Sequence, residues 1–173
     1  MRLYSGQVRV IAREILDDLV KAAAVEIDEG REEDARLDIE AVLKEYIRVD
    51  RELSEQARDL VRERGMGNSA FAKTKRQLAK QIEFKVGEDA MTWIIDQCIE
   101  MLIYTDNIAE VFSDDLALRV IVRTVLRRYD DTETELDREV RGKLKHLEEG
   151  STSWDVEYQR AMDNIKRTKG LNG

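Results

Sequence analysis

Few side chains in this sequence are of the types that usually carry out chemistry. The 173 residues include one cysteine, Cys98, and one histidine, His146. A single cysteine excludes an internal disulfide framework and any multi-cysteine metal site, and a single histidine excludes most metal and triad chemistry that needs several imidazoles. Cys98 falls on the apolar stripe of an expected helix, so we expect it to pack as a small hydrophobic residue. We expect His146 to be exposed near a helix C-terminus.

The sequence also lacks the common catalytic motifs. Its nine glycines are scattered and none precedes a Lys-Ser/Thr pair, so there is no phosphate-binding loop. There is no serine-centred nucleophile motif and no Glu-x-x-His pair like those of helical di-iron sites. Carboxylates could share a helix face at Asp34 and Asp38, but interspersed arginines favour a solvated, salt-bridged face over a cation site. We therefore expect no enzymatic activity, no bound metal and no cofactor.

The distribution of charge is more informative than the catalytic residue types. With 29 Lys and Arg against 37 Asp and Glu, the formal net charge is −8. Residues 26–63 hold fourteen acids and seven bases, whereas residues 64–82 hold five bases and no acid. A second basic row consists of Arg119, Arg123 and Arg127, which recur every four residues on one expected helix face. Together these segments give the candidate docking residues Lys73, Lys75, Arg76, Lys80, Arg119, Arg123 and Arg127.

Three interpretations of these basic segments stay open. They could be an ordinary mixed surface, they could dock a protein partner or the acidic face of a second copy, or they could bind the phosphates of a nucleic acid. We favour a protein over a nucleic acid, because the net negative field repels a polyanion and no aromatic platform for single strands is evident.

Composition favours a helical protein without membrane spans. Apolar residues make up 42% and charged residues 38%, which fits neither a disordered acidic chain nor a membrane protein. Proline, the strongest helix breaker, does not occur. The most apolar stretch, residues 90–104, is interrupted by charge and is shorter than the ~20 residues of a membrane span. The first residues lack the apolar core of a signal peptide, so we expect a cytoplasmic protein.

The second half of the sequence repeats the apolar pattern of the first half. An i, i+3, i+4, i+7 stripe over residues 8–20 recurs over 91–103, and a longer stripe over 39–61 recurs at the same offset over 122–144. Shorter stripes over 71–82 and 154–165 follow, and the first is expected to turn Phe71, Leu78 and Ile82 toward the core. Leu53 and Leu136 fall in the middle of the long stripes, so we expect both to be buried.

These stripes predict an all-α fold of about six helices in two pseudo-symmetric three-helix units. The first unit covers residues 1–83, the second covers 84–166, and 167–173 form a short tail; with no Pro-, Ser- or Gly-rich linker between them, the units are expected to pack as one domain. The long stripes leave two options, either continuous helices or breaks near 49–51 and 132–134. Segments 25–28 and 109–112, one residue out of step in the repeat, either stay irregular or form a tiny two-stranded pairing.

Trp93 is the aromatic side chain whose role the pattern leaves open. It lies off the main apolar stripe of its helix. Either another helix packs on it, or it is exposed and marks an interface, since tryptophan is enriched at binding hot spots.

Several segments resemble a known family. The opening Met1-Arg2-Leu3-Tyr4-Ser5-Gly6, the run Asp38-Ile39-Glu40-Ala41-Val42-Leu43-Lys44-Glu45-Tyr46 and the run Trp154-Asp155-Val156-Glu157-Tyr158-Gln159-Arg160 resemble a bacterial family known as domain of unknown function 507. The resemblance covers essentially the whole chain. It implies a small cytoplasmic bacterial protein and carries over no catalytic residues. We expect a non-catalytic interaction or scaffold protein, with self-association as one option; the alternative is a nucleic-acid- or ribosome-associated protein.

Overall fold

The fold is built almost entirely from helices. A computed structural model of the chain describes residues 1, 3, 5–145, 147 and 152–168. The α-helices in this part are α1 (Val8–Lys21), α2 (Glu32–Glu63), α3 (Phe71–Gln81), α4 (Ala90–Tyr104), α5 (Asp115–Lys143) and α6 (Thr152–Thr168). Strands β1 (Val25–Ile27) and β2 (Ile108–Val111) form a two-stranded antiparallel sheet. The predicted all-α class with six helices is confirmed, and the option of a small strand pair is the one observed.

Both long helices are continuous. α2 has 32 residues, which corresponds to about 48 Å at 1.5 Å per residue, and α5 has 29. The option of a break near 49–51 is wrong because salt bridges one turn apart hold the surface there, between Arg48 and both Glu45 and Glu52, and between Arg51 and Glu55. The apolar stripe is thin at this point, but these pairs and the helix backbone carry α2 through it.

The elements recur with the spacing of the sequence repeat. β1 begins at Val25 and β2 at Ile108, and α2 begins at Glu32 and α5 at Asp115, so both pairs of starting points are separated by the same offset as the apolar stripes. The strands are thus in step, not one residue apart as the sequence pattern suggested. α1 packs on both α2 and α5, and α4 packs on both α5 and α2. The two sets of helices are therefore interlocked, and the strands join across them.

Apolar side chains gather in two separate clusters. The main core takes the inner faces of α1 and α4, the face of α2 as far as Leu53 and the first half of α5, together with Ala79 of α3 and Phe84. A second, smaller cluster, here called the arm cluster, lies between the end of α5 and α6 and consists of Leu136, Val140, Leu144, Met162 and Ile165. Leu53 and Leu136 are buried, at 3% and 1% exposure, as the stripes predict.

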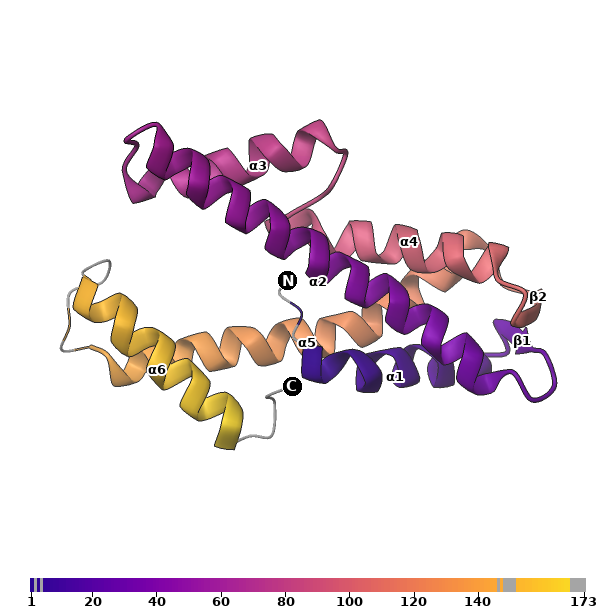
Figure 1. The fold of residues 1–173 in the computed structure, drawn as a ribbon. Helices are drawn as coiled ribbons and strands as arrows, with labels where there is room; N and C mark the ends of the chain where they lie inside the picture. The colour runs from indigo at the N-terminus through magenta and orange to yellow at the C-terminus, as the bar shows by residue number, and fades with distance from the viewer. Residues whose placement is uncertain (2, 4, 146, 148–151, 169–173) are drawn as a thin grey trace.

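The long helices extend beyond the main core as two arms. In Figure 1, β1 and β2 lie at one end of the molecule, and α3 and α6 lie at the far ends of α2 and α5. α3 packs on α2, and α6 packs on α5. Among the described residues, no helix is both long and apolar enough to cross a membrane.

Two details differ from the sequence prediction. Ile82 was expected to face the core, but it is 57% exposed because α3 ends at Gln81 and the chain turns at Glu83, whose φ of +55° is left-handed. Phe84, two residues later, returns to the core and is buried. α6 continues through Thr168, two residues into the predicted tail, whose residues 169–173 lie outside the described part.

Candidate interaction surfaces

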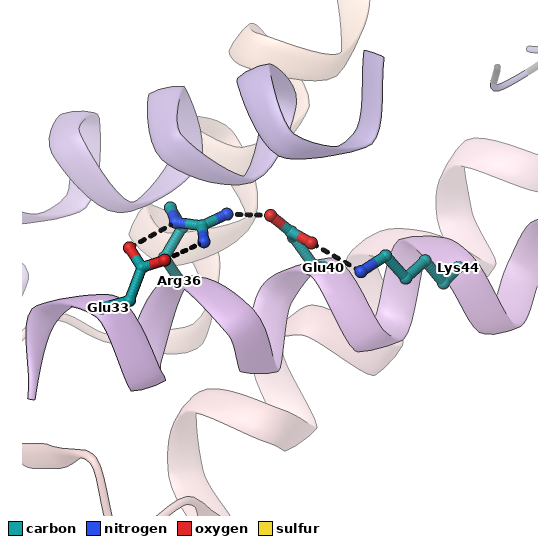
Figure 2. A network of polar contacts seen from close by, with 4 residues as sticks. All are labelled: Glu33, Arg36, Glu40 and Lys44. Atoms are coloured by element: carbon teal, nitrogen blue, oxygen red, sulfur yellow. Dashed lines mark hydrogen bonds and ion pairs between the residues drawn. The ribbon is translucent and has the colours of Figure 1, made fainter. Parts of the chain in front are cut away.

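An ion-pair network with a buried centre and exposed ends ties together successive turns of α2 (Figure 2). Arg36 donates from Nε to Glu33 at 2.9 Å and from Nη1 to Glu40, and Lys44 contacts the other oxygen of Glu40 at 2.6 Å. The side chains of Arg36 and Glu40 are 6% and 7% exposed. The hydrogen bond from Arg36 holds the pKa of Glu33 below its usual value. Because both oxygens of Glu40 are engaged by cations, this carboxylate serves as a link within the helix.

A second cluster joins the loop before α4 to α4 and α5. Asp96 accepts a hydrogen bond from Lys85 at 3.0 Å and another from Arg119, and Arg119 also donates to Asp115 at 2.6 Å. Partial burial alone would raise the pKa of Asp96, but the hydrogen bonds from Arg119 and Lys85 outweigh it and hold the pKa below its usual value. Arg119, one of the candidate docking residues, is thus engaged within the fold.

The Asp96 cluster predicts a defined response to acid. Since the folded-state pKa of Asp96 is lowered, its contribution to stability is fully present above the unfolded-state pKa and is lost as the pH falls through the folded value. We expect Asp96→Asn to lower the thermal midpoint at pH 7, and we expect its difference from wild type to shrink between about pH 5 and pH 2. Circular-dichroism melts at several pH values measure this; a difference that stays constant with pH would contradict it.

Three cations form an exposed row on α3. Lys73, Arg76 and Lys80 are exposed, and within the described part of the chain they make no ion pair. We call them the α3 cation row. The fourth candidate on this helix, Lys75, instead binds Asp50 of α2 at 2.6 Å, and its side chain is 17% exposed. The structure thus brings together three of the four cations that the sequence singled out here.

A groove with an apolar floor adjoins the α3 cation row. It has a volume of about 500 Å³ and lies between the end of α3 and the chain that leads into α4. Ala79, Phe84 and Val86 contribute its apolar surface, whereas Arg76, Lys80 and Lys85 contribute cations and Glu83 and Asp89 contribute acids. Lys85 is bound to Asp96, so Arg76 and Lys80 are the lining cations without an ion pair among the described residues, and they lie on the α3 side of the groove.

The second basic row does not join the first. Its residues lie on the part of α5 that packs on α1 and α4, while α3 lies at the end of α2 (Figure 1). Arg123 is half-buried and Arg127 is exposed, and neither makes an ion pair with the described residues. Arg128 beside them reaches Glu14 and Asp18 of α1 at 3.2 and 3.0 Å. This row therefore offers two cations to a partner.

Trp93 packs inside the protein against two other rings. Its ring centroid lies 5.6 Å from that of Tyr46 and 4.8 Å from that of Phe84, and the Tyr46 and Phe84 rings stack at 5.0 Å. We call these three residues the aromatic cluster. Trp93 remains half-buried, which corresponds to the packing option. Burial raises the pKa of Tyr46, with the nearby charge of Asp50 adding to it.

Cys98 and His146 are the side chains whose types are most suited to catalysis or metal binding, and the described part of the structure builds no such site around them. Cys98 is fully buried in the main core, and this burial raises the pKa of its thiol to about 12. His146 lies outside the described residues. Among those that are described, no group of three or more His, Cys, Asp or Glu side chains is placed to hold a metal ion.

The strand pair carries a surface that the sequence reasoning missed. Glu26 and Glu110 are directly opposite each other in the register, and both are exposed. Phe112, two residues beyond Glu110 and just past the end of β2, is 56% exposed. We call these three residues the acidic ribbon. The glutamates lie in the two segments for which the sequence left a strand pairing as one of two options, and only the observed register places them side by side.

Comparison with protein families gives a match over nearly the whole chain. The family described as "Protein of unknown function (DUF507)" matches residues 1–171 of the chain. No curated protein matches it.

Proposed function

We propose that this chain, which belongs to the DUF507 family, is a non-catalytic cytoplasmic interaction protein whose docking site is the α3 cation row and its adjoining groove. The observation that carries the proposal is the contrast between this row and the other charges. Lys75, Arg119 and Arg128 are engaged by acids of the same chain, and Arg123 and Arg127 are two further cations without an ion pair among the described residues. The α3 cation row instead presents three such cations, and two of them line a groove with apolar surface. An acidic protein surface with an apolar side chain is the occupant that fits.

The remaining groups support a binding role over catalysis. The buried carboxylate Glu40 is held by two cations, and Asp96 is held by Lys85 and Arg119. The thiol of Cys98 is buried and its raised pKa keeps it protonated at neutral pH, so it is a poor nucleophile. These groups stabilise the fold rather than face a substrate.

Charge reversal of the α3 cation row tests the proposal. Exposed charges contribute little to stability, so Lys73→Glu/Arg76→Glu/Lys80→Glu is expected to fold and melt close to wild type. The same variant is expected to lose the partners that wild-type protein captures from a host lysate. Capture by wild type is also expected to weaken toward ~0.5 M salt, because exposed charge pairs are screened. The measurement is a quantitative pull-down with both proteins at equal concentration.

The matched control is Arg123→Glu/Arg127→Glu on α5. This variant reverses two exposed or half-exposed cations away from the α3 groove, and capture is expected to survive it. If the variant with the reversed α3 cation row still captures the partners, the α3 cation row is not the docking site. Loss of capture in the α5 control alone would lead to the same conclusion. A partner released by nuclease, with log affinity falling by about 0.7 to 0.9 per decade of salt for each phosphate contacted, would favour the nucleic-acid alternative instead.

A further inference from the structure

The α3 cation row and the acidic ribbon lie at opposite ends of the same long helix. The acidic ribbon lies next to the start of α2 and the α3 cation row follows its end (Figure 1). α2 is continuous and spans about 48 Å, so it keeps the two surfaces apart within one molecule. Opposite charges at the two ends of a rigid rod can meet only between two molecules.

The acidic ribbon lacks the countercharges that other acids of this protein have. Glu26 and Glu110 face each other across the strand pair, and like charges in directly opposite positions are destabilising. Neither makes an ion pair within the described residues, and the nearby Asp28, Glu29 and Asp106 are exposed acids without one as well. Of the cations in neighbouring segments, Arg31 is bonded to Asp34. The ribbon therefore presents an unfavourable pair that a cation from outside would relieve.

We infer that the α3 cation row and its groove bind the acidic ribbon of a second copy of this chain. This inference rests on the proposed function and names the partner. The ribbon places Phe112 beside a pair of glutamates, and the groove places an apolar floor beside Arg76 and Lys80. The groove is open to solvent and, at about 500 Å³, has room for the ring of Phe112.

A closed pair of antiparallel copies satisfies both ends at once. Each copy carries one cation row and one ribbon, so a two-fold arrangement uses both surfaces of both copies and leaves none open. One such contact, made by three turns of helix and a short strand, falls below the roughly 1,200 Å² of a stable interface. Two contacts in one pair reinforce each other, because the second forms within an existing complex. The net charge of −8 on each copy is screened beyond about 8 Å at physiological salt.

The first measurement is the mass of the full chain in solution at ~0.15 M salt. Light scattering or sedimentation over a range of concentrations is expected to show a shift from 20.1 kDa toward twice that value. The basic-end variant, Arg76→Glu/Lys80→Glu, and the acidic-end variant, Glu26→Lys/Glu110→Lys, are each expected to weaken association by at least about tenfold. A wild-type protein that keeps the mass of a single chain at every concentration would overturn the inference.

The decisive measurement mixes the two variants. In an antiparallel pair of one basic-end variant and one acidic-end variant, one contact joins the two wild-type surfaces and the other joins the two reversed surfaces, so both again join opposite charges. An equimolar mixture is therefore expected to regain the association that each variant alone has lost. A mixture that remains monomeric would show that the two ends do not bind each other.

Phe112→Ser, which changes no charge and removes an exposed ring, is a second variant that is expected to weaken association while the helical content stays unchanged.

The control and the earlier pull-down separate this inference from the proposed function. Arg123→Glu/Arg127→Glu is expected to associate like wild type, and equal loss in this control would overturn the assignment to α3. If the chain is monomeric while reversal of the α3 cation row still abolishes capture of a partner from lysate, the second copy is the wrong occupant and the docking site stands. If the mixture of the two variants associates but capture of partners from lysate does not depend on the α3 cation row, the contact between two copies is supported and the proposed docking of other proteins is contradicted.

Discussion

Replacing Leu136 by alanine is expected to unfold the arm of α5 and α6 while the main core stays folded. Leu136 is 1% exposed and belongs to the arm cluster, which is separate from the main core. Truncating a buried leucine costs about 2–5 kcal/mol, and a cluster of five buried side chains has little stability to lose. The equivalent change in the first half of the chain, Leu53→Ala, strikes a side chain that packs in the main core and is expected to destabilise the whole molecule.

The two tryptophans report on the two clusters separately. Trp154 packs on the arm cluster, stacked on Tyr158 with ring centroids 4.8 Å apart, whereas Trp93 lies in the aromatic cluster of the core. Fluorescence during urea unfolding is measured in Trp93→Phe and Trp154→Phe backgrounds. With Leu136→Ala, the Trp154 signal is expected to change at a lower urea concentration than the Trp93 signal. Coincident transitions would show that arm and core unfold as one unit.

Phe84→Ala is expected to lower the free energy of unfolding by about 3–5 kcal/mol. Phe84 is 6% exposed and contacts both other rings of the aromatic cluster. Its removal leaves a cavity and also ends two ring contacts worth about 0.5–1.5 kcal/mol each. Because Phe84 is the point where the chain from α3 returns to the core, the loss also loosens α3. Urea unfolding followed by circular dichroism measures the change.

Phe112→Ala is the matched control for this experiment. It removes the same ring from a position that is 56% exposed, so at protein concentrations at which the chain is monomeric its effect on the free energy of unfolding is expected to be small. Trp93 emission is expected to shift to longer wavelength with Phe84→Ala and to stay unchanged with Phe112→Ala. Equal effects of the two changes would mean that Phe84 contributes no more than a surface ring.

The helices could be predicted from the sequence because a helix is specified by local spacing. The stripes of residues 8–20 and 91–103 are buried as predicted except at their ends, where Val20 and Ile103 are exposed and Met91 is half-buried. Val20 and Ile103 both lie in the last turn of their helix, directly after the buried Leu19 and Leu102. The repeat of the stripes also predicted which helices of the two halves correspond to each other, because each apolar stripe must be buried against another helix.

The site was less predictable because it depends on contacts between distant residues. Lys75 and Arg76 are adjacent in the sequence, but Asp50 of α2 engages Lys75 and leaves Arg76 exposed. The groove floor depends on the left-handed turn at Glu83, which no stripe encodes and which brings Phe84 rather than Ile82 to the core. The opposition of Glu26 and Glu110 likewise follows from a strand register between segments far apart in the chain. Helix periodicity does not carry this information.

The interlocked arrangement also sets the order in which the protein can fold while it is being synthesised. α1 needs α5 as a packing partner, and Val25 of β1 pairs with Val111, which lies in the second half of the chain. At about 5–20 residues per second, a ribosome takes roughly 4–17 s to synthesise the segment from Val25 to Val111. During this time the apolar face of α1 has only α2 to cover it. The core therefore closes late, after α5 has emerged, and the nascent first half is the stage at which this protein most needs protection from aggregation.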